Sequence, residues 1–141
     1  MPTLQATPWS TGQPTGCPLV GAWRLIRIEL RSRDGRAGPD LFRNATGRLE
    51  YLPDGRMSFE LAEGAWRRTW HGSYASYLDP FAPANDRVVH RIDRASDPAL
   101  VGTEEQRRVQ LRGDTLAWPG TPFWAHGERW TPRLVWQRAA S

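Results

Sequence analysis

Apolar and polar residues alternate along most of the chain after residue 18, in short runs separated by turns that contain glycine and aspartate. Alternation with a period of two places successive side chains on opposite faces of a β-strand. No segment of about ten residues keeps the roughly 3.6-residue period of an amphipathic helix. The pattern therefore predicts an all-β protein of about eight strands.

Local signals predict how these strands are shaped and connected. Asp54-Gly55 is a strong two-residue hairpin signal, and Arg112-Gly113-Asp114 is a second turn between strands. In the first strand, Trp23 and Leu25 share one face, whereas the next apolar residues share the other face. This switch indicates a bulge or a change of twist within the strand.

The short connections also predict the overall architecture. They require antiparallel neighbours, and eight antiparallel strands must close or fold over to protect the edges of the sheet. We therefore expect a small antiparallel up-and-down β-barrel over residues 19–138. Residues 1–18 are rich in proline, threonine, serine and glycine and show no periodicity, so they are predicted to be a disordered tail.

Polar side chains interrupt the apolar face of two strands within Arg87–Trp118. His90 lies between apolar neighbours in the first strand, and Thr103, Glu105 and Arg107 share one face of the second. Burial of ionisable groups costs several kcal/mol (roughly) unless they are paired. Such a face forms an internal network of ion pairs or lines a cavity.

Composition places the chain among soluble globular proteins. Hydrophobic residues make up 39% and charged residues 24% of the 141 residues. No run approaches the ~18 apolar residues of a membrane span, and the N-terminus lacks the basic start and apolar stretch of a signal peptide. Cys17, the single cysteine, cannot form an internal disulfide and is expected to be passive rather than reactive. These features predict a cytoplasmic protein.

Charge and motifs weigh against several classes of function. The net charge is +4, and all 19 basic residues are arginines interleaved with 15 acids, so nucleic-acid binding is a minority interpretation. His71, His90 and His126 lie on separate segments without the spacing of metal ligands. The chain has no phosphate loop, nucleophile elbow or dinucleotide fingerprint, so we expect neither a metal nor a cofactor.

Four segments resemble successive blocks of the bacterial lipocalin-like domain family: LVGAWRL, ATGRLEYLPDGRMS, VVHRIDRASDPALVGTEEQRRVQLRGDTL and RLVWQR. Gly21-Ala22-Trp23 matches the G-x-W of lipocalins. The resemblance implies a barrel with an internal cavity, and some members belong to natural-product pathways in which small barrels bind or cyclise hydrophobic intermediates. Two departures stand out: Ala62-Glu63-Gly64 leads almost directly into Trp66, where many members carry a lid-like helical insertion, and Glu105 stands where relatives often have glutamine.

Eight tryptophans supply candidate ligand contacts. The lipocalin pattern implies that Trp23 plugs the closed end and that Arg138 stacks across it. Large flat rings near a barrel mouth suit a polycyclic or polyene ligand, although the same rings could simply fill the core of a small barrel. The predicted ligand-binding residues are Tyr51, Met57, Phe59, Trp66, Trp70, Tyr77, Trp118 and Trp124.

The predicted catalytic residues are Glu105, His90 and Arg107. If their strands are neighbours, His90 comes within hydrogen-bond reach of Glu105 or Arg107, which would form a general acid–base pair beside a cation. The alternative is a structural Glu–Arg bridge inside the barrel, with His90 as a packed core residue.

Three functions follow as hypotheses. The first is a cofactor-independent cyclase or isomerase that holds a hydrophobic intermediate in a reactive shape. The second is a carrier of the same fold that binds its ligand without catalysis. The third is a nucleic-acid or protein interaction module. The expected partner is a hydrophobic small molecule, and the chain is expected to be a monomer or homodimer.

Overall fold

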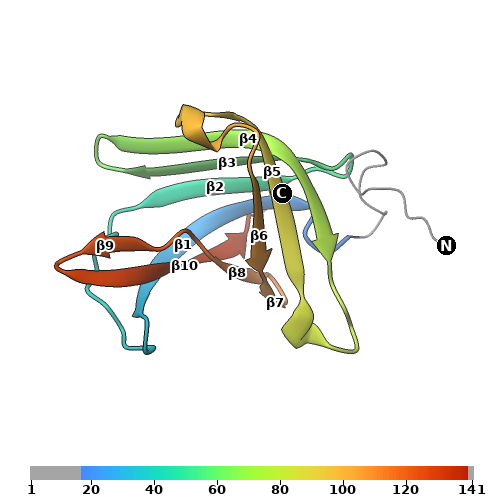
Figure 1. The fold of residues 1–141 in the computed structure, drawn as a ribbon. Coiled ribbons are helices and arrows are strands. Elements are labelled where there is room, and N and C mark those ends of the chain that lie inside the picture. The colour runs from blue at the N-terminus through green and yellow to red at the C-terminus, as the bar shows by residue number, and fades with distance from the viewer. Residues whose placement is uncertain (1–16, 140–141) are drawn as a thin grey trace.

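Ten antiparallel strands curl around one apolar core in a computed structural model that describes residues 17–139 (Figure 1). The strands are β1 (Gly21–Ser32), β2 (Thr46–Tyr51), β3 (Arg56–Glu63), β4 (Trp66–Tyr77), β5 (Arg87–Ala95), β6 (Glu104–Arg108), β7 (Gln110–Arg112), β8 (Thr115–Pro119), β9 (Phe123–Ala125) and β10 (Glu128–Arg138). Two single-turn 3₁₀ helices, η1 (Pro83–Asn85) and η2 (Pro98–Leu100), occupy loops. The all-β prediction is confirmed. No helix in residues 17–139 has the length and apolar character needed to cross a membrane.

The sheet closes on itself because one segment pairs with both of its edges. The strand order is β6-β5-β4-β3-β2-β1-β10-β8-β7, and β9 pairs with β10. β6 and β7 end this order, yet only Val109 separates them in the chain. The segment 104–112 therefore pairs with β5 through its first half and with β8 through its second half. β6 itself has no backbone ladder with β8, so the barrel is nearly closed.

The predicted strand count of eight was wrong, since the barrel has ten. Val109 interrupts the predicted strand after Thr103, because its backbone N–H bonds to the carbonyl of Asp86 at 3.1 Å instead of continuing a ladder. β9 lies in a segment that contains glycine and prolines, which disfavour strands, and it pairs with the first residues of β10. Both differences arise from tertiary pairing that local composition does not encode.

The predicted turns and the bulge in the first strand are confirmed. Gly55 and Gly113 have φ of 90° and 58°, the left-handed conformation that tight hairpins require. The pairing of β1 with β10 shifts register between Leu25 and Arg27. Ile26 is displaced outward and is 39% exposed, which allows the apolar residues on both sides of the bulge to face the core.

A tryptophan plug seals one end of the barrel, as predicted. The Arg138 guanidinium carbon lies 4.3 Å from the centre of the Trp23 ring. Its two terminal nitrogens donate hydrogen bonds to the carbonyls of Val20 at 3.0 Å and Pro18 at 2.7 Å, and the Trp23 indole donates to Leu19 at 2.9 Å. We call this the closed end; it also carries the β2–β3, β4–β5 and β7–β8 connections.

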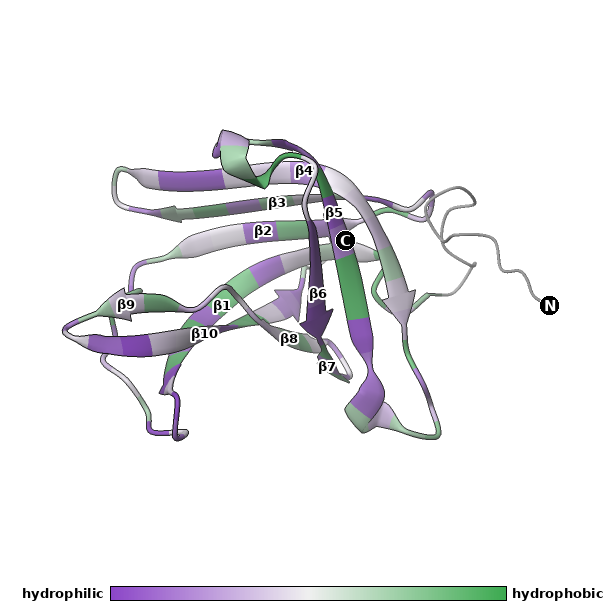
Figure 2. Ribbon diagram, viewed as in Figure 1, coloured by the Kyte–Doolittle hydropathy of each residue, from purple (hydrophilic) through white to green (hydrophobic). Residues whose placement is uncertain are grey.

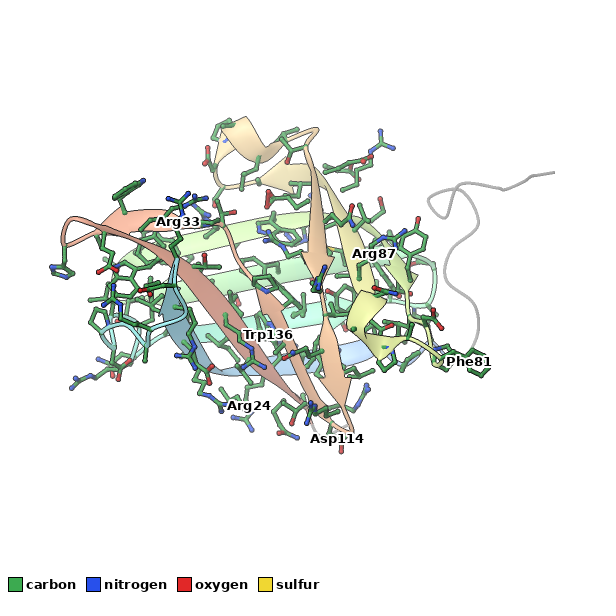
Figure 3. The ribbon with its side chains drawn as sticks, turned by 60° about the horizontal axis from the view of Figure 1, so that its bottom comes forward. Arg24, Arg33, Phe81, Arg87, Asp114 and Trp136 are labelled. Atoms are coloured by element: carbon green, nitrogen blue, oxygen red, sulfur yellow. The ribbon has the colours of Figure 1, made fainter. Side chains whose placement is uncertain are left out.

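The opposite, open end carries the β1–β2, β3–β4, β5–β6 and β9–β10 connections (Figure 1). Arg33 of the β1–β2 loop and Phe81 of the β4–β5 loop accordingly lie at opposite ends of the molecule (Figure 3). The predicted tail falls mostly outside the described residues. Cys17 is described, packs against the core and lies 3.3 Å from the hydroxyl of Ser76.

We expect Arg138→Met to lower the free energy of unfolding by about 1–3 kcal/mol, because the carbonyls of Pro18 and Val20 lose a charged donor and Trp23 loses its cation. Arg129→Met, an exposed position on the same strand, serves as the control and should change stability little. Urea denaturation of both variants measures the difference. Equal stability of the two variants would contradict the plug.

Candidate functional site

A cavity of about 500 Å³ occupies the half of the barrel nearer the open end. Its wall is mainly apolar and aromatic, with two arginines and two glutamates among the lining residues. The residues that line it are Ile28, Phe42, Phe59, Leu61, Glu63, Trp66, Arg68, Trp70, Leu100, Glu105, Arg107, Trp118, Gly120, Thr121, Pro122, Phe123, Pro132 and Leu134.

Arg107 spans the unpaired seam between β6 and β8, beside the cavity. One terminal nitrogen donates to the carbonyl of Pro119 on β8 at 2.9 Å, and the other to the carboxylate of Glu105 at 2.5 Å. Its guanidinium carbon lies 4.9 Å from the centre of the Trp118 ring. β6 is a strongly hydrophilic stretch of the wall (Figure 2). A side chain thus supplies the contact between β6 and β8 that a backbone ladder would otherwise make.

The environment of Arg107 opposes its charge, and Glu105 compensates. The side chain is only 9% exposed. Burial lowers the pKa of Arg107 below its ordinary value, whereas the nearby Glu105 carboxylate raises it. The Glu–Arg bridge that the sequence left as an alternative therefore exists, and it borders a cavity at the same time.

His90 lies behind the cavity wall rather than on it. The side chain is fully buried and pairs through Nε2 with the Tyr51 hydroxyl at 2.7 Å. Its ring centre lies 5.1 Å from that of Trp70 and 5.4 Å from that of Trp118, and these two rings separate it from the cavity. Burial, with a smaller contribution from Arg107, lowers the pKa of His90 well below its ordinary value, so the imidazole is neutral.

His90 and Glu105 lie opposite each other on neighbouring strands, as predicted, but they do not form a hydrogen bond with each other. The two residues are direct partners in the pairing of β5 with β6. His90 nevertheless bonds to Tyr51 on β2, across the barrel, and Glu105 bonds to Arg107 on its own strand. Burial also raises the pKa of the Tyr51 hydroxyl. The three predicted catalytic residues therefore belong to two separate pairs, Glu105 with Arg107 and His90 with Tyr51.

The predicted ligand-binding residues divide between the cavity and other places. Phe59, Trp66, Trp70 and Trp118 line the cavity. The four that do not line it are Tyr51 and Met57, which are buried in the core, Tyr77, which packs under the Arg87 guanidinium at 4.2 Å, and Trp124, which is 73% exposed.

The aromatic residues fill the core and line the cavity at once. The Phe59 and Trp70 rings stack with centres 4.6 Å apart, and Trp118 packs between Phe59 at 6.0 Å and Trp136 at 5.8 Å. Phe59, Trp70 and Trp118 present surface to the cavity, whereas Trp136 is fully buried. The cavity floor is therefore a layer of rings that pack tightly against one another.

Sequence reasoning missed several lining residues. Arg68 shares the inner face of β4 with Trp66 and Trp70. A charged residue on an otherwise apolar strand face is the signal that identified Glu105 and Arg107, and it could have identified Arg68 as well. Phe42 and Phe123, whose rings meet edge to face at 5.9 Å, come from the β1–β2 loop and β9. No local pattern predicts that these two segments approach each other. Within residues 17–139, no group of three or more His, Cys, Asp or Glu side chains could hold a metal ion.

Burial of neutral His90 predicts that acid destabilises the fold. Its folded-state pKa is lowered, so below the ordinary value of 6.5 the unfolded chain binds the extra proton and the stability present at higher pH is lost. We expect the free energy of unfolding to fall by about 1–2 kcal/mol from about pH 7.5 to about pH 5 because of this residue. His90→Gln should remove that part of the dependence. His71→Gln, at an exposed position, should keep the pH dependence of wild type. Urea titrations of both variants at each pH measure the difference, and equal pH dependence in the two variants would refute the role of His90.

No curated protein matches this chain. Among solved structures, the lipoprotein YedD from Klebsiella pneumoniae subsp. pneumoniae is similar with a TM-score of 0.48 and 11% sequence identity, over 93% of this chain and 78% of that chain. A family model described as a lipocalin-like domain matches residues 69–139, just over half of the chain. The chain belongs to the lipocalin-like domain family.

Proposed function

We propose that this protein binds a hydrophobic small molecule with a flat ring system in the barrel cavity. The observation that carries the proposal is the cavity itself, whose volume of about 500 Å³ and aromatic floor match the sites that proteins use for small ligands. Membership of the lipocalin-like family supports the same function.

The walls suit a flat ligand in particular. Phe59, Trp70 and Trp118 offer ring surface to the cavity, and Trp66 at the rim is 44% exposed. An aromatic ligand gains about 0.5–1.5 kcal/mol for each favourable ring contact beyond the burial of its area. The buried pairing of Arg107 with Glu105 adds polar groups at a fixed position, which can orient the ligand.

The surface arginines give less support to a nucleic-acid function. Arg27, Arg36, Arg56 and Arg133 each form an ion pair with an acid within 4 Å. Such pairing offsets part of the basic charge that binding of a phosphate backbone would require.

The uncharged fluorophore N-phenyl-1-naphthylamine tests binding directly. We expect one molecule to bind per chain, with energy transfer from the tryptophans of the cavity. Trp66→Ala should weaken binding roughly three- to tenfold, because a ring at the rim is lost. Trp124→Ala is the matched control: it removes a more exposed open-end tryptophan that does not line the cavity, and the affinity should stay within about twofold of wild type. No saturable binding, or equal losses in both variants, would contradict the proposal.

A second candidate function is cyclisation or isomerisation of the bound molecule. One observation favours it: the Glu105 carboxylate lines the cavity, is 26% exposed and is held in place by Arg107. A positioned carboxylate can move a proton between two atoms of a substrate that the walls hold in a folded shape. His90 would act in this reaction through the packing of the floor, since it does not line the cavity.

Glu105→Gln separates the two candidates. Under the catalytic one, this variant should convert ligands that co-purify with the protein about 100-fold more slowly, and it should retain binding of the neutral fluorophore. Glu104→Gln, the exposed neighbour on β6, should convert them at the wild-type rate. Chromatographic separation of products of unchanged mass measures the conversion. Absence of conversion by wild type would leave binding as the function.

A further inference from the structure

Four charged residues line the cavity, and only two of them form an ion pair. Arg107 bonds to Glu105, which neutralises it. Arg68 makes no ion pair or hydrogen bond with any other residue of the described part of the chain; its guanidinium carbon lies 5.7 Å from the centre of the Trp66 ring. A cation thus faces the cavity without a partner.

The position of Arg68 is set by the alternation of β4. Arg68 lies on the inner face, directly opposite Leu61 of β3, whereas Arg67 lies on the outer face and pairs with Glu60 at 3.5 Å. Consecutive arginines therefore experience two environments: one has a carboxylate at the surface, and the other has aromatic rings and the cavity. An unpaired cation that is partly removed from water is costly unless an anion reaches it.

Arg68 on β4 and Arg107 on β6 both line the cavity. The charge of Arg68 lowers the pKa of Arg107 further. The Nε of Arg107 is buried and makes no hydrogen bond within the described chain. Two guanidinium groups and the Glu105 carboxylate therefore line the same cavity, and Arg68 is the guanidinium group that has no carboxylate partner among the described residues.

Glu63 adds a negative charge at the hairpin end of the cavity. It is opposite Trp66 in register, and its buried Oε2 has no hydrogen-bond partner among residues 17–139. Glu63 and Arg68 form no ion pair within 4 Å, so the Arg68 cation stays available to an anionic ligand. Like charges repel, so Glu63 disfavours an anionic group beside its own carboxylate.

We propose that the ligand is an anionic amphiphile, a hydrophobic ring system with one carboxylate or sulfonate group that Arg68 binds. This inference rests on the proposed binding function and names the class of ligand. The planar guanidinium of Arg68 suits the task because its paired N–H groups match the geometry of an oxyanion, and the Trp66 ring lies beside it, 5.7 Å from the guanidinium carbon.

Two fluorophores with the same ring skeleton test the inference: N-phenyl-1-naphthylamine, which is neutral, and 1-anilinonaphthalene-8-sulfonate, which carries a sulfonate. Wild type should bind the sulfonate about tenfold more tightly than the neutral probe. Arg68→Met should remove that preference, which is measured as the ratio of the two affinities in the same variant. Arg68→Lys should retain part of it, because the charge remains.

Arg67→Met is the matched control, since it changes the net charge equally but lies on the outer face. It should keep the wild-type preference, and thermal melting should show that all variants fold. The inference would be overturned if Arg68→Met kept the preference for the sulfonate probe, or if Arg67→Met and Arg68→Met lost that preference equally. In either case, binding of the neutral probe would leave the proposed function standing. Failure of wild type to bind either probe would overturn both.

Discussion

One buried guanidinium bridges the place where the backbone ladder of this barrel stops. β6 and β8 approach each other without pairing, and Arg107 spans them through Pro119 while Glu105 compensates its charge. Unpaired strand edges that face an interior leave polar groups unsatisfied, which is costly. The same residues border the cavity, because Glu105 and Arg107 of β6 and Trp118 of β8 all line it.

The position of the ion pair also explains why the barrel tolerates it. Buried ion pairs contribute little net stability, since desolvation offsets their attraction. The stable part of the barrel is elsewhere: Trp23 and Arg138 at the closed end, and the layer formed by Tyr51, His90 and the floor tryptophans. The seam lies between that layer and the open end, beside the cavity. Polar side chains there lose less free energy of hydration than they would in the centre of the core.

The sequence predicted those features that depend on neighbours along the chain. Alternation located the strands, glycines located the hairpins, and the G-x-W resemblance located the stacking of Trp23 with Arg138. It also placed Glu105 and Arg107 on an inner face. The partner of His90 escaped prediction, because Tyr51 is distant in sequence and the register of the barrel decides which wall it meets.

The cavity was harder to predict than the barrel for a related reason. Phe42, Leu100 and Phe123 belong to loops or to a short strand, and their contribution to the wall depends on how the open end folds over the core. The exposure of Trp124 beside a lining Phe123 shows how one step along a strand moves an aromatic ring from the cavity to solvent.

The division between the two ends has a consequence for evolution. The closed end contains the tryptophan plug, whereas Phe42 and Leu100, in the open-end loops, contact a ligand space and carry no part of that plug. Substitutions in such loops cost less stability than substitutions in a packed core. Substitutions in the open-end loops can therefore change the ligand specificity of this barrel during evolution while the fold is retained.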